Sequence, residues 1–246
     1  MDRADVLIAG CGTGQQSIET AMTFKHKSVL AVDLSLASLC YAKRKTLELG
    51  APPIEYAQAD IMQLAGLGRG FDLIEASGVL HHLGDPFDGW RVLLSLLRPG
   101  GVMRLGFYSE LARRDIVAAR AYIAERNYDA NPSAIRAFRQ ELLALGDRPW
   151  ARSIVESGDF ATLSACRDLL FHVQEHRLSL PQIAAFLGEK ALRFVGFEMR
   201  LTTRAAYAAR FPGDLAMTDL ASWHIFETEN PDTFRGMYQF WVQKSE

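Results

Sequence analysis

The chain has 246 residues, of which 49% are hydrophobic and 23% are charged, and its formal net charge is −2. This apolar content is enough for a sizeable buried core, while the near-neutral balance gives no electrostatic reason to expect nucleic acid or an anionic membrane as the main partner. Three scattered cysteines are too few for a disulfide framework, no signal peptide opens the sequence, and no apolar run approaches the ~18 residues of a membrane-spanning helix, so we expect a cytoplasmic protein.

The first half of the sequence alternates short apolar runs with amphipathic segments. The apolar runs predict strands at residues 5–9, 28–33, 54–59, 71–76 and 102–107. The segments between them predict helices at residues 15–24, 36–49, 61–64 and 86–97. This rhythm predicts an α/β fold with a doubly wound, mostly parallel sheet.

The first predicted strand leads directly into a turn with glycines at 10, 12 and 14. Glycines let the backbone approach a ligand at the carboxyl end of such a strand. The spacing is Gly-x-Gly-x-Gly, not the Gly-x-Gly-x-x-Gly that seats a pyrophosphate, and residues 10–22 contain no Lys or Arg. Asp33 ends the second strand and can accept two hydroxyl donors. The pattern indicates a nucleoside without phosphate, such as S-adenosylmethionine, and from the turn alone a nicotinamide or flavin remains the alternative.

Five motifs in order resemble those of the class I S-adenosylmethionine-dependent methyltransferases. They are Val6–Gly14, Asp33-Leu34-Ser35, Ala59-Asp60-Ile61, Phe71–Leu83 and Leu97-Arg98-Pro99-Gly100-Gly101. The resemblance implies S-adenosylmethionine as cofactor, with the turn against its methionine part, Asp33 on the ribose and Asp60 with Ile61 around the adenine. The cofactor-binding residues it implies are Gly10, Cys11, Gly12, Gly14, Gln15, Asp33, Leu34, Asp60, Ile61, Gly78 and Val79.

Several of these residues also have a simpler structural interpretation. Asp33 could satisfy backbone amides near Ser35, and Asp60 could cap the short helix that follows it. Cys11 lies between two glycines, where a small buried side chain is commoner than a nucleophile.

Acceptor-side candidates come from three separate segments. A histidine takes up a proton near neutral pH, but adjacent residues point in different directions, so at most one of His81 and His82 is expected to face an acceptor. Tyr108 follows the fifth strand, where the ligand crevice of such a sheet lies, although it could equally be core packing. The candidate catalytic residues are His81, His82 and Tyr108, together with His172, Glu175 and His176 if the helices after residue 110 fold down.

The segment from His172 to His176 also matches the His-x-x-Glu-His arrangement of inverted zinc peptidases. On a helix both imidazoles would share a face. A third ligand would be needed, and nothing in the sequence places Glu227 or Glu229 beside them. We therefore expect no metal.

The second half departs from the simple strand–helix rhythm. Residues 110–188 are mostly helical by periodicity, which predicts a cap above the strand ends that sets acceptor specificity. Strands return at 193–201 and 237–244, around a helical excursion at 207–234. The resemblance to class I methyltransferases implies that they are the two final strands of that family's seven-stranded sheet, with the last one antiparallel. The predicted division is a cofactor-binding core at 1–109, a helical cap at 110–190 and C-terminal strands of the core sheet at 191–246.

A second resemblance lies in this half. Residues 168–177, 180–183 and 230–241 look like parts of bacterial methyltransferase modules that are fused to tetratricopeptide repeats. The first strand begins within a few residues of Met1, where class I methyltransferases usually have helical residues that close over the cofactor. We expect a truncated domain, an open pocket, or a lid supplied by a homo-oligomer or another partner.

The sequence thus predicts in-line methyl transfer from a sulfonium to an unidentified acceptor, either a small molecule or a protein. One alternative is a non-catalytic S-adenosylmethionine- or S-adenosylhomocysteine-binding module of a larger repeat protein or complex. The other is a nicotinamide oxidoreductase, which would need a third glycine at the position of Gln15.

Overall fold

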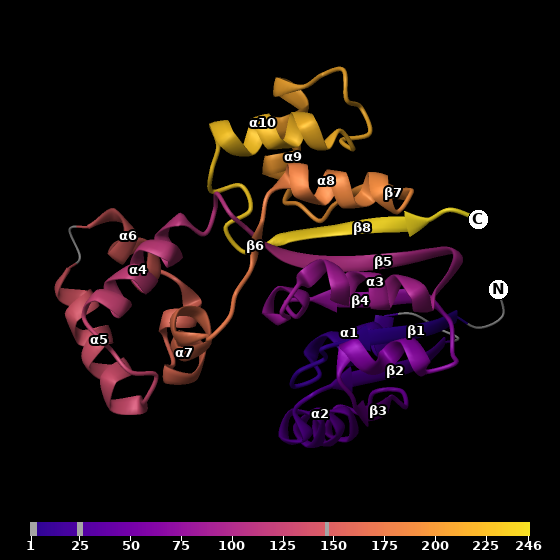
Figure 1. Ribbon diagram of the computed structural model, residues 1–246, viewed down its shortest axis with the longest axis horizontal. Coiled ribbons are helices and arrows are strands. Elements are labelled where there is room, and N and C mark those ends of the chain that lie inside the picture. Colours follow the sequence, from indigo (N-terminus) through magenta and orange to yellow (C-terminus); the bar gives the residue numbers. More distant parts are fainter. Residues whose placement is uncertain (1–3, 24–26, 146–147) are drawn as a thin grey trace.

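The computed structural model describes residues 4–23, 27–145 and 148–246 (Figure 1). Its strands are β1 (Ala4–Ala9), β2 (Lys27–Asp33), β3 (Glu55–Gln58), β4 (Phe71–Ser77), β5 (Leu97–Ser109), β6 (Arg177–Leu178), β7 (Leu192–Phe197) and β8 (Tyr238–Lys244). Its α-helices are α1 (Gln15–Thr23), α2 (Leu36–Glu48), α3 (Pro86–Leu96), α4 (Arg114–Glu125), α5 (Pro132–Ala144), α6 (Pro149–Val155), α7 (Leu163–Phe171), α8 (Leu180–Glu189), α9 (Leu201–Arg210) and α10 (Leu220–Glu229). Short 3₁₀ helices are η1 (Ile61–Gly66), η2 (Leu80–His82) and η3 (Gly158–Phe160).

The central sheet has the strand order β3-β2-β1-β4-β5-β8-β7, and β6 pairs with β5 off this path. The first five strands of that order are parallel to one another, whereas β8 is antiparallel to both β5 and β7. The predicted doubly wound sheet and its antiparallel last strand are confirmed. Because the first five strands are parallel, their carboxyl ends meet at one edge of the sheet.

Several predicted boundaries were wrong. The strand expected at 193–201 ends at Phe197, and Leu201 instead begins α9, after a register shift between Phe194 and Gly196. The fifth strand is longer than predicted because Leu97 already pairs with Phe71. The helix expected at 61–64 is the 3₁₀ helix η1, and the last residue of the helix expected at 15–24 lies outside the described residues.

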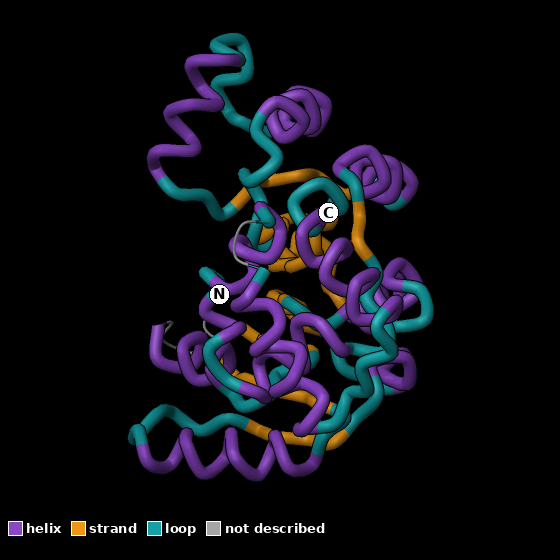
Figure 2. Tube along the Cα trace, turned by 90° about the vertical axis from the view of Figure 1, so that its left-hand side faces the viewer, coloured by secondary structure: helices purple, strands orange, loops and turns teal. Residues whose placement is uncertain are grey.

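Helices cover both faces of the sheet (Figure 2). On one face, Trp90 of α3 contacts the rings of Phe107, Phe186 and Phe240, at centroid distances of 5.5, 4.3 and 6.0 Å. On the other face, the smaller side chains of β1 and β2 pack against α1 and α2. This close packing on both faces fixes the strand ends in place.

Helices α4 to α7 form a separate helical unit beside the sheet (Figure 1). Its own apolar core includes the predicted buried face of α4, namely Ile116, Ala119, Tyr122 and Ile123. The buried side chains of α8 belong instead to the main core of the sheet. The predicted division of the chain into three parts stays a prediction. No helix of the described residues is long and apolar enough to cross a membrane.

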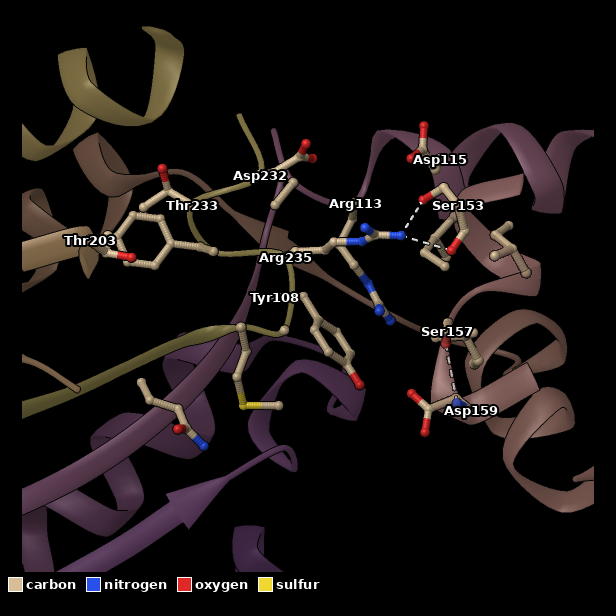
Figure 3. Close-up of a pocket in the computed structure, with 18 of the residues that line it drawn as sticks. Tyr108, Arg113, Asp115, Ser153, Ser157, Asp159, Thr203, Asp232, Thr233 and Arg235 are labelled. Atoms are coloured by element: carbon tan, nitrogen blue, oxygen red, sulfur yellow. Dashed lines mark hydrogen bonds between the residues drawn. The ribbon is translucent and has the colours of Figure 1, made fainter. Parts of the chain in front are cut away.

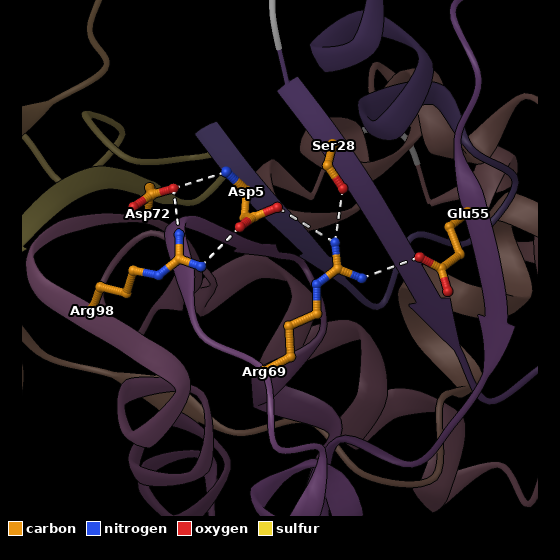
Figure 4. A network of polar contacts seen from close by, with 6 residues as sticks. All are labelled: Asp5, Ser28, Glu55, Arg69, Asp72 and Arg98. Atoms are coloured by element: carbon orange, nitrogen blue, oxygen red, sulfur yellow. Dashed lines mark hydrogen bonds and ion pairs between the residues drawn. The ribbon is translucent and has the colours of Figure 1, made fainter. Parts of the chain in front are cut away.

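A network of charged side chains joins the amino ends of the strands (Figure 4). Arg98 bridges two carboxylates, with its Nη2 2.8 Å from Asp5 Oδ2 and its Nη1 2.7 Å from Asp72 Oδ2. Arg69 reaches Glu55 at 3.1 Å and donates to Ser28 at 2.7 Å. The hydrogen bond and charge of Arg98 lower the pKa of Asp5. This edge is therefore held by ion pairs among its own side chains.

Candidate functional site

The glycine turn stands at the carboxyl end of β1, and all three glycines have a left-handed backbone, with φ of +73°, +51° and +90° at Gly10, Gly12 and Gly14. A Cβ on Gly10 would lie 2.4 Å from Val79 Cγ2, and one on Gly14 would lie 2.6 Å from Ala42 Cβ. A Cβ on Gly12 would meet no described atom within 4 Å. Two of the glycines therefore serve packing as well as conformation, while Gly12 faces open space that a ligand can use.

Asp33 connects the ends of β1 and β2. Its Oδ2 accepts a hydrogen bond from the Gly12 amide at 2.8 Å, and its Oδ1 accepts one from the Ser35 amide at 2.8 Å. The structural role considered for Asp33 is thus present. A carboxylate oxygen has a second acceptor site, so both oxygens retain the capacity to accept a ligand hydroxyl.

The third strand end contributes Asp60 and Ile61. The carboxylate of Asp60 caps η1 by accepting the Met62 amide at 2.9 Å, as its structural interpretation predicts. Ile61 is buried, whereas Leu34 is 70% exposed beside the end of β2. The Ala59 amide donates to the Asp33 carbonyl at 3.1 Å, which brings these two strand ends together. Contact of this edge with an adenine stays a prediction.

Cys11 and Gln15 lie in the same turn but differ in exposure. Cys11 is buried in the core against α1 and α2, and burial raises the pKa of its thiol to about 12. A thiol with that pKa stays protonated and is a poor nucleophile. Gln15 is exposed at the start of α1.

The end of β4 leaves a polar atom unsatisfied. The hydroxyl of Ser77 is buried and has no hydrogen-bond partner among the described residues. Gly78 follows with φ of +76°, and Val79 packs against Gly10. A buried hydroxyl without a partner, at the end of the strand that pairs with β1, is the arrangement expected where a polar ligand completes the hydrogen bonding.

The structure brings the acceptor-side candidates together. The ring centroid of His81 lies 4.1 Å from that of Tyr108 and 4.3 Å from that of His82, and His82 stacks on His172 at 3.8 Å. His81 is fully buried, and neither ring nitrogen has a partner among the described residues. Burial, with smaller contributions from His82 and Arg113, lowers the pKa of His81 to about 3. His81 is therefore neutral at pH 7 and a weak base.

The segment after α7 contacts this cluster through its backbone. The carbonyl oxygen of Gln174 lies 3.0 Å from His82 Nδ1 and 2.8 Å from His172 Nδ1, and the His176 amide donates to the His81 carbonyl at 2.8 Å. Burial also lowers the pKa of His82.

These contacts contradict the geometry that a zinc site would need. Residues 172–176 are not helical, so His172 and His176 do not share a helix face. Glu175 is paired with Arg113 at 2.7 Å, and the exposed fractions of the two side chains are only 1% and 6%. Across residues 4–23, 27–145 and 148–246, no group of three or more His, Cys, Asp or Glu side chains is arranged to hold a metal ion.

A cavity of about 960 Å³ opens between the end of β5, the helical unit and the segment before β8 (Figure 3). Tyr108 points into it, with the guanidinium carbon of Arg113 3.5 Å from the centre of the Tyr108 ring. Burial raises the pKa of Tyr108, so its hydroxyl remains a hydrogen-bond donor. Arg235 donates to the carbonyl and the hydroxyl of Ser153, each at 2.7 Å, and so connects the segment before β8 with α6.

The cavity adjoins the end of β4 through Met237. A Cβ on Gly78 would lie 3.8 Å from Met237 Cε, and Met237 also lines the cavity. Neither the glycine turn nor Asp33 lines it. Tyr108 was expected from the sequence, whereas Met237 and Arg235 were not, because the lining comes from several separate segments that share no sequence period.

A glycine turn, a carboxylate after β2 and an adjoining cavity at one sheet edge are the features of a class I methyltransferase fold. Residues 6–101 match the family model described as a methyltransferase domain. This part of the chain is therefore similar to a methyltransferase domain.

Individual relatives match all or part of the same region. An uncharacterized protein of a Synechococcus strain is 29% identical over 218 residues, which cover 81% of this chain and 50% of that protein. The trans-aconitate 2-methyltransferase of Deinococcus radiodurans is 37% identical over 100 residues, which cover 41% of this chain and 36% of that enzyme. The chain thus spans half or less of the length of these relatives.

Among solved structures, PKMT2 from Rickettsia typhi in complex with AdoHcy has a TM-score of 0.73 and 16% identity, covering 99% of this chain and 49% of that one. At that identity the likeness shows the fold alone. It nevertheless extends over the second half of the chain, which the methyltransferase family model does not match.

Proposed function

We propose that this protein transfers a methyl group from S-adenosylmethionine to an acceptor bound in the cavity beside Tyr108. The observation that carries the proposal is the open space at Gly12 next to Asp33, because the cofactor has ribose hydroxyls to donate and no phosphate to neutralise. The match of residues 6–101 to the methyltransferase domain supports the same cofactor.

On the cofactor side, the chain's role is to bind and orient. Gly12 admits the ligand, Asp33 accepts its ribose hydroxyls, and the Ser77 hydroxyl supplies a polar group that lacks a protein partner among the described residues. Asp60 and Ile61 border the adenine. When bound, the cofactor supplies an activated methyl group.

On the acceptor side, the chain aligns a nucleophile and excludes water. Tyr108 donates a hydrogen bond to the acceptor from the cavity wall. Neither histidine of the adjacent pair lines the cavity. Burial lowers the pKa of both, and His82 is the better base of the two because it is only half-buried whereas His81 is fully buried with a pKa of about 3. The acceptor is a small molecule or a protein side chain that fits a cavity of about 960 Å³.

The non-catalytic alternative keeps the same cofactor site but needs no acceptor. The cavity next to the end of β4 favours the enzyme, because a binding module has no use for a second pocket there. The resemblance to modules fused to tetratricopeptide repeats stays a prediction, as does a homo-oligomer or other partner that covers the cofactor cleft.

Calorimetric titration tests the cofactor. We expect S-adenosylmethionine and S-adenosylhomocysteine to bind and NADH not to bind. Asp33→Ala should lose most of the affinity, because it removes the ribose acceptor and frees the Gly12 amide. Asp88→Ala is the matched control, since Asp88 is a surface carboxylate paired with Arg91 on α3. Tight binding of NADH, or no binding of either sulfur nucleoside by folded protein, would overturn the proposal.

A further inference from the structure

A row of charged side chains crosses one face of the sheet just below its carboxyl edge. Glu75 of β4 and Arg104 of β5 are paired in register. The guanidinium of Arg104 makes two bonds of 2.7 Å to Glu198, which follows β7, and reaches Glu75 more weakly at 3.3 Å. The row holds two carboxylates and one guanidinium, and therefore carries one excess negative charge.

Glu75 is the member of the row nearest to the cofactor turn. Its side chain is buried, and its carboxylate accepts hydrogen bonds from Gln16 and, at 2.8 Å, from Thr20, both on α1. Accepting from these donors and from Arg104 is the pattern of an ionised carboxylate. Arg104 is engaged mainly by Glu198, so the charge of Glu75 is only partly compensated.

The row lies directly beneath the candidate cofactor site. Ser77, whose hydroxyl is unsatisfied, is two residues after Glu75 and therefore on the same face of β4, roughly 7 Å away along the strand. Gln16, the other neighbour, is the second residue of α1 and follows Gly14 by only two residues. Nothing in the proposed binding of ribose, adenine or acceptor uses Glu75.

We propose that Glu75 makes this site selective for the cationic form of its nucleoside, S-adenosylmethionine, over the neutral S-adenosylhomocysteine. The inference rests on the proposed function. The two nucleosides share their adenine, ribose, carboxylate and amino groups and differ by one methyl group and one positive charge. A buried, partly compensated carboxylate interacts with that charge only before transfer. When the methyl group leaves, the sulfur keeps the electron pair and becomes neutral, so the attraction disappears and product release is favoured.

The test compares three nucleosides by calorimetry on intact protein. They are S-adenosylmethionine, S-adenosylhomocysteine and sinefungin, in which an ammonium-bearing carbon replaces the sulfonium. Glu75→Gln keeps the shape and the hydrogen-bonding oxygen while removing the charge. We expect this substitution to lower the affinity for the two cationic nucleosides about fivefold and the affinity for the neutral one less than twofold. Glu156→Gln, which removes an exposed charge from the helical unit, is the control and should change none of them.

Glu198→Gln provides a second variant if Glu75→Gln does not fold. It releases Arg104 to compensate Glu75, so the preference for the cationic nucleosides should fall about twofold. Equal weakening of all three nucleosides by Glu75→Gln would overturn the inference, because it would mark a structural role through α1. An unchanged ratio in both variants would overturn it as well. If the unaltered protein binds no nucleoside, the proposed function fails first and the inference falls with it.

Discussion

At the amino ends of the parallel strands, Arg98 bridges Asp5 and Asp72, whereas at their carboxyl ends Ser77 and His81 are buried without a hydrogen-bond partner among the described residues. The first edge has charged side chains that pair with one another. The second edge has left-handed glycines and polar atoms with spare capacity. Buried polar groups are normally paired, so the difference separates the edge that stabilises the sheet from the edge that binds.

The largest expected effect comes from breaking the buried ion pair at the carboxyl edge. Glu175→Gln leaves the guanidinium of Arg113 without its partner in a place where both side chains are nearly inaccessible. We expect the free energy of unfolding to fall by about 3 kcal/mol. Urea denaturation followed by circular dichroism measures this loss.

The exposed carboxylate Glu48 offers a matched control for that measurement. It pairs with Lys45 on the surface of α2, so Glu48→Gln should change the free energy of unfolding by less than about 0.5 kcal/mol. If Glu175→Gln lowered the free energy of unfolding no more than Glu48→Gln does, burial of the Arg113–Glu175 pair would not contribute to stability.

A second prediction concerns the pH dependence caused by His81. In the unfolded chain this histidine binds a proton below its ordinary pKa of 6.5, but in the folded protein it does so only near 3. The folded state therefore loses stability as the pH falls through 6.5. At pH 5.5 the loss should be about 1.4 kcal/mol relative to pH 7.5. The substitution His81→Leu should remove this contribution to the pH dependence of stability.

Urea denaturation of both proteins at pH 7.5 and 5.5 checks the prediction. The difference in stability between His81→Leu and the unaltered protein should shift in favour of the variant at the lower pH. The same pH dependence in both proteins would mean that His81 is protonated in the folded state, and that its burial does not control its charge.

The carboxyl edge was largely predictable from the sequence where the signal is local. The glycine turn, Asp33 and the strand rhythm are each set by a few neighbouring residues, and the doubly wound, mostly parallel sheet followed from that rhythm. The predicted end of β7 was wrong because the register of β7 against β8 shifts between Phe194 and Gly196, and no local sequence pattern indicates this shift.

Residues that act across strands were missed. In the sequence, Glu75 is one residue of a mostly apolar strand and nothing marks it as special. Its role becomes visible only from the register with Arg104 and the hydrogen bonds that α1 donates to it. The cavity could not be predicted either, because two of the residues that line it, Arg235 and Ser153, are 82 residues apart in the chain. Their proximity depends on how the helical unit packs beside the sheet.

The smallest expected effect is at the amino edge. Asp5→Asn removes one of the two carboxylates bridged by Arg98, in a network that is partly exposed, so we expect a loss of only about 1 kcal/mol at pH 7. Arg98 lowers the pKa of Asp5 below its ordinary 3.8, so the stabilisation is present above that pH and is lost as the pH falls further.

The stability difference between Asp5→Asn and the unaltered protein should therefore be constant from pH 7 to about 5 and shrink below about 4. Urea denaturation across this range measures it, and calorimetry of the same variant should give unchanged affinity for S-adenosylmethionine. Weaker nucleoside binding in Asp5→Asn would contradict the separation of the two edges, because a charge at the opposite end of β1 would then influence the site. Unchanged binding, beside the loss expected for Asp33→Ala, would place the stabilising and the binding carboxylates at opposite ends of adjacent strands.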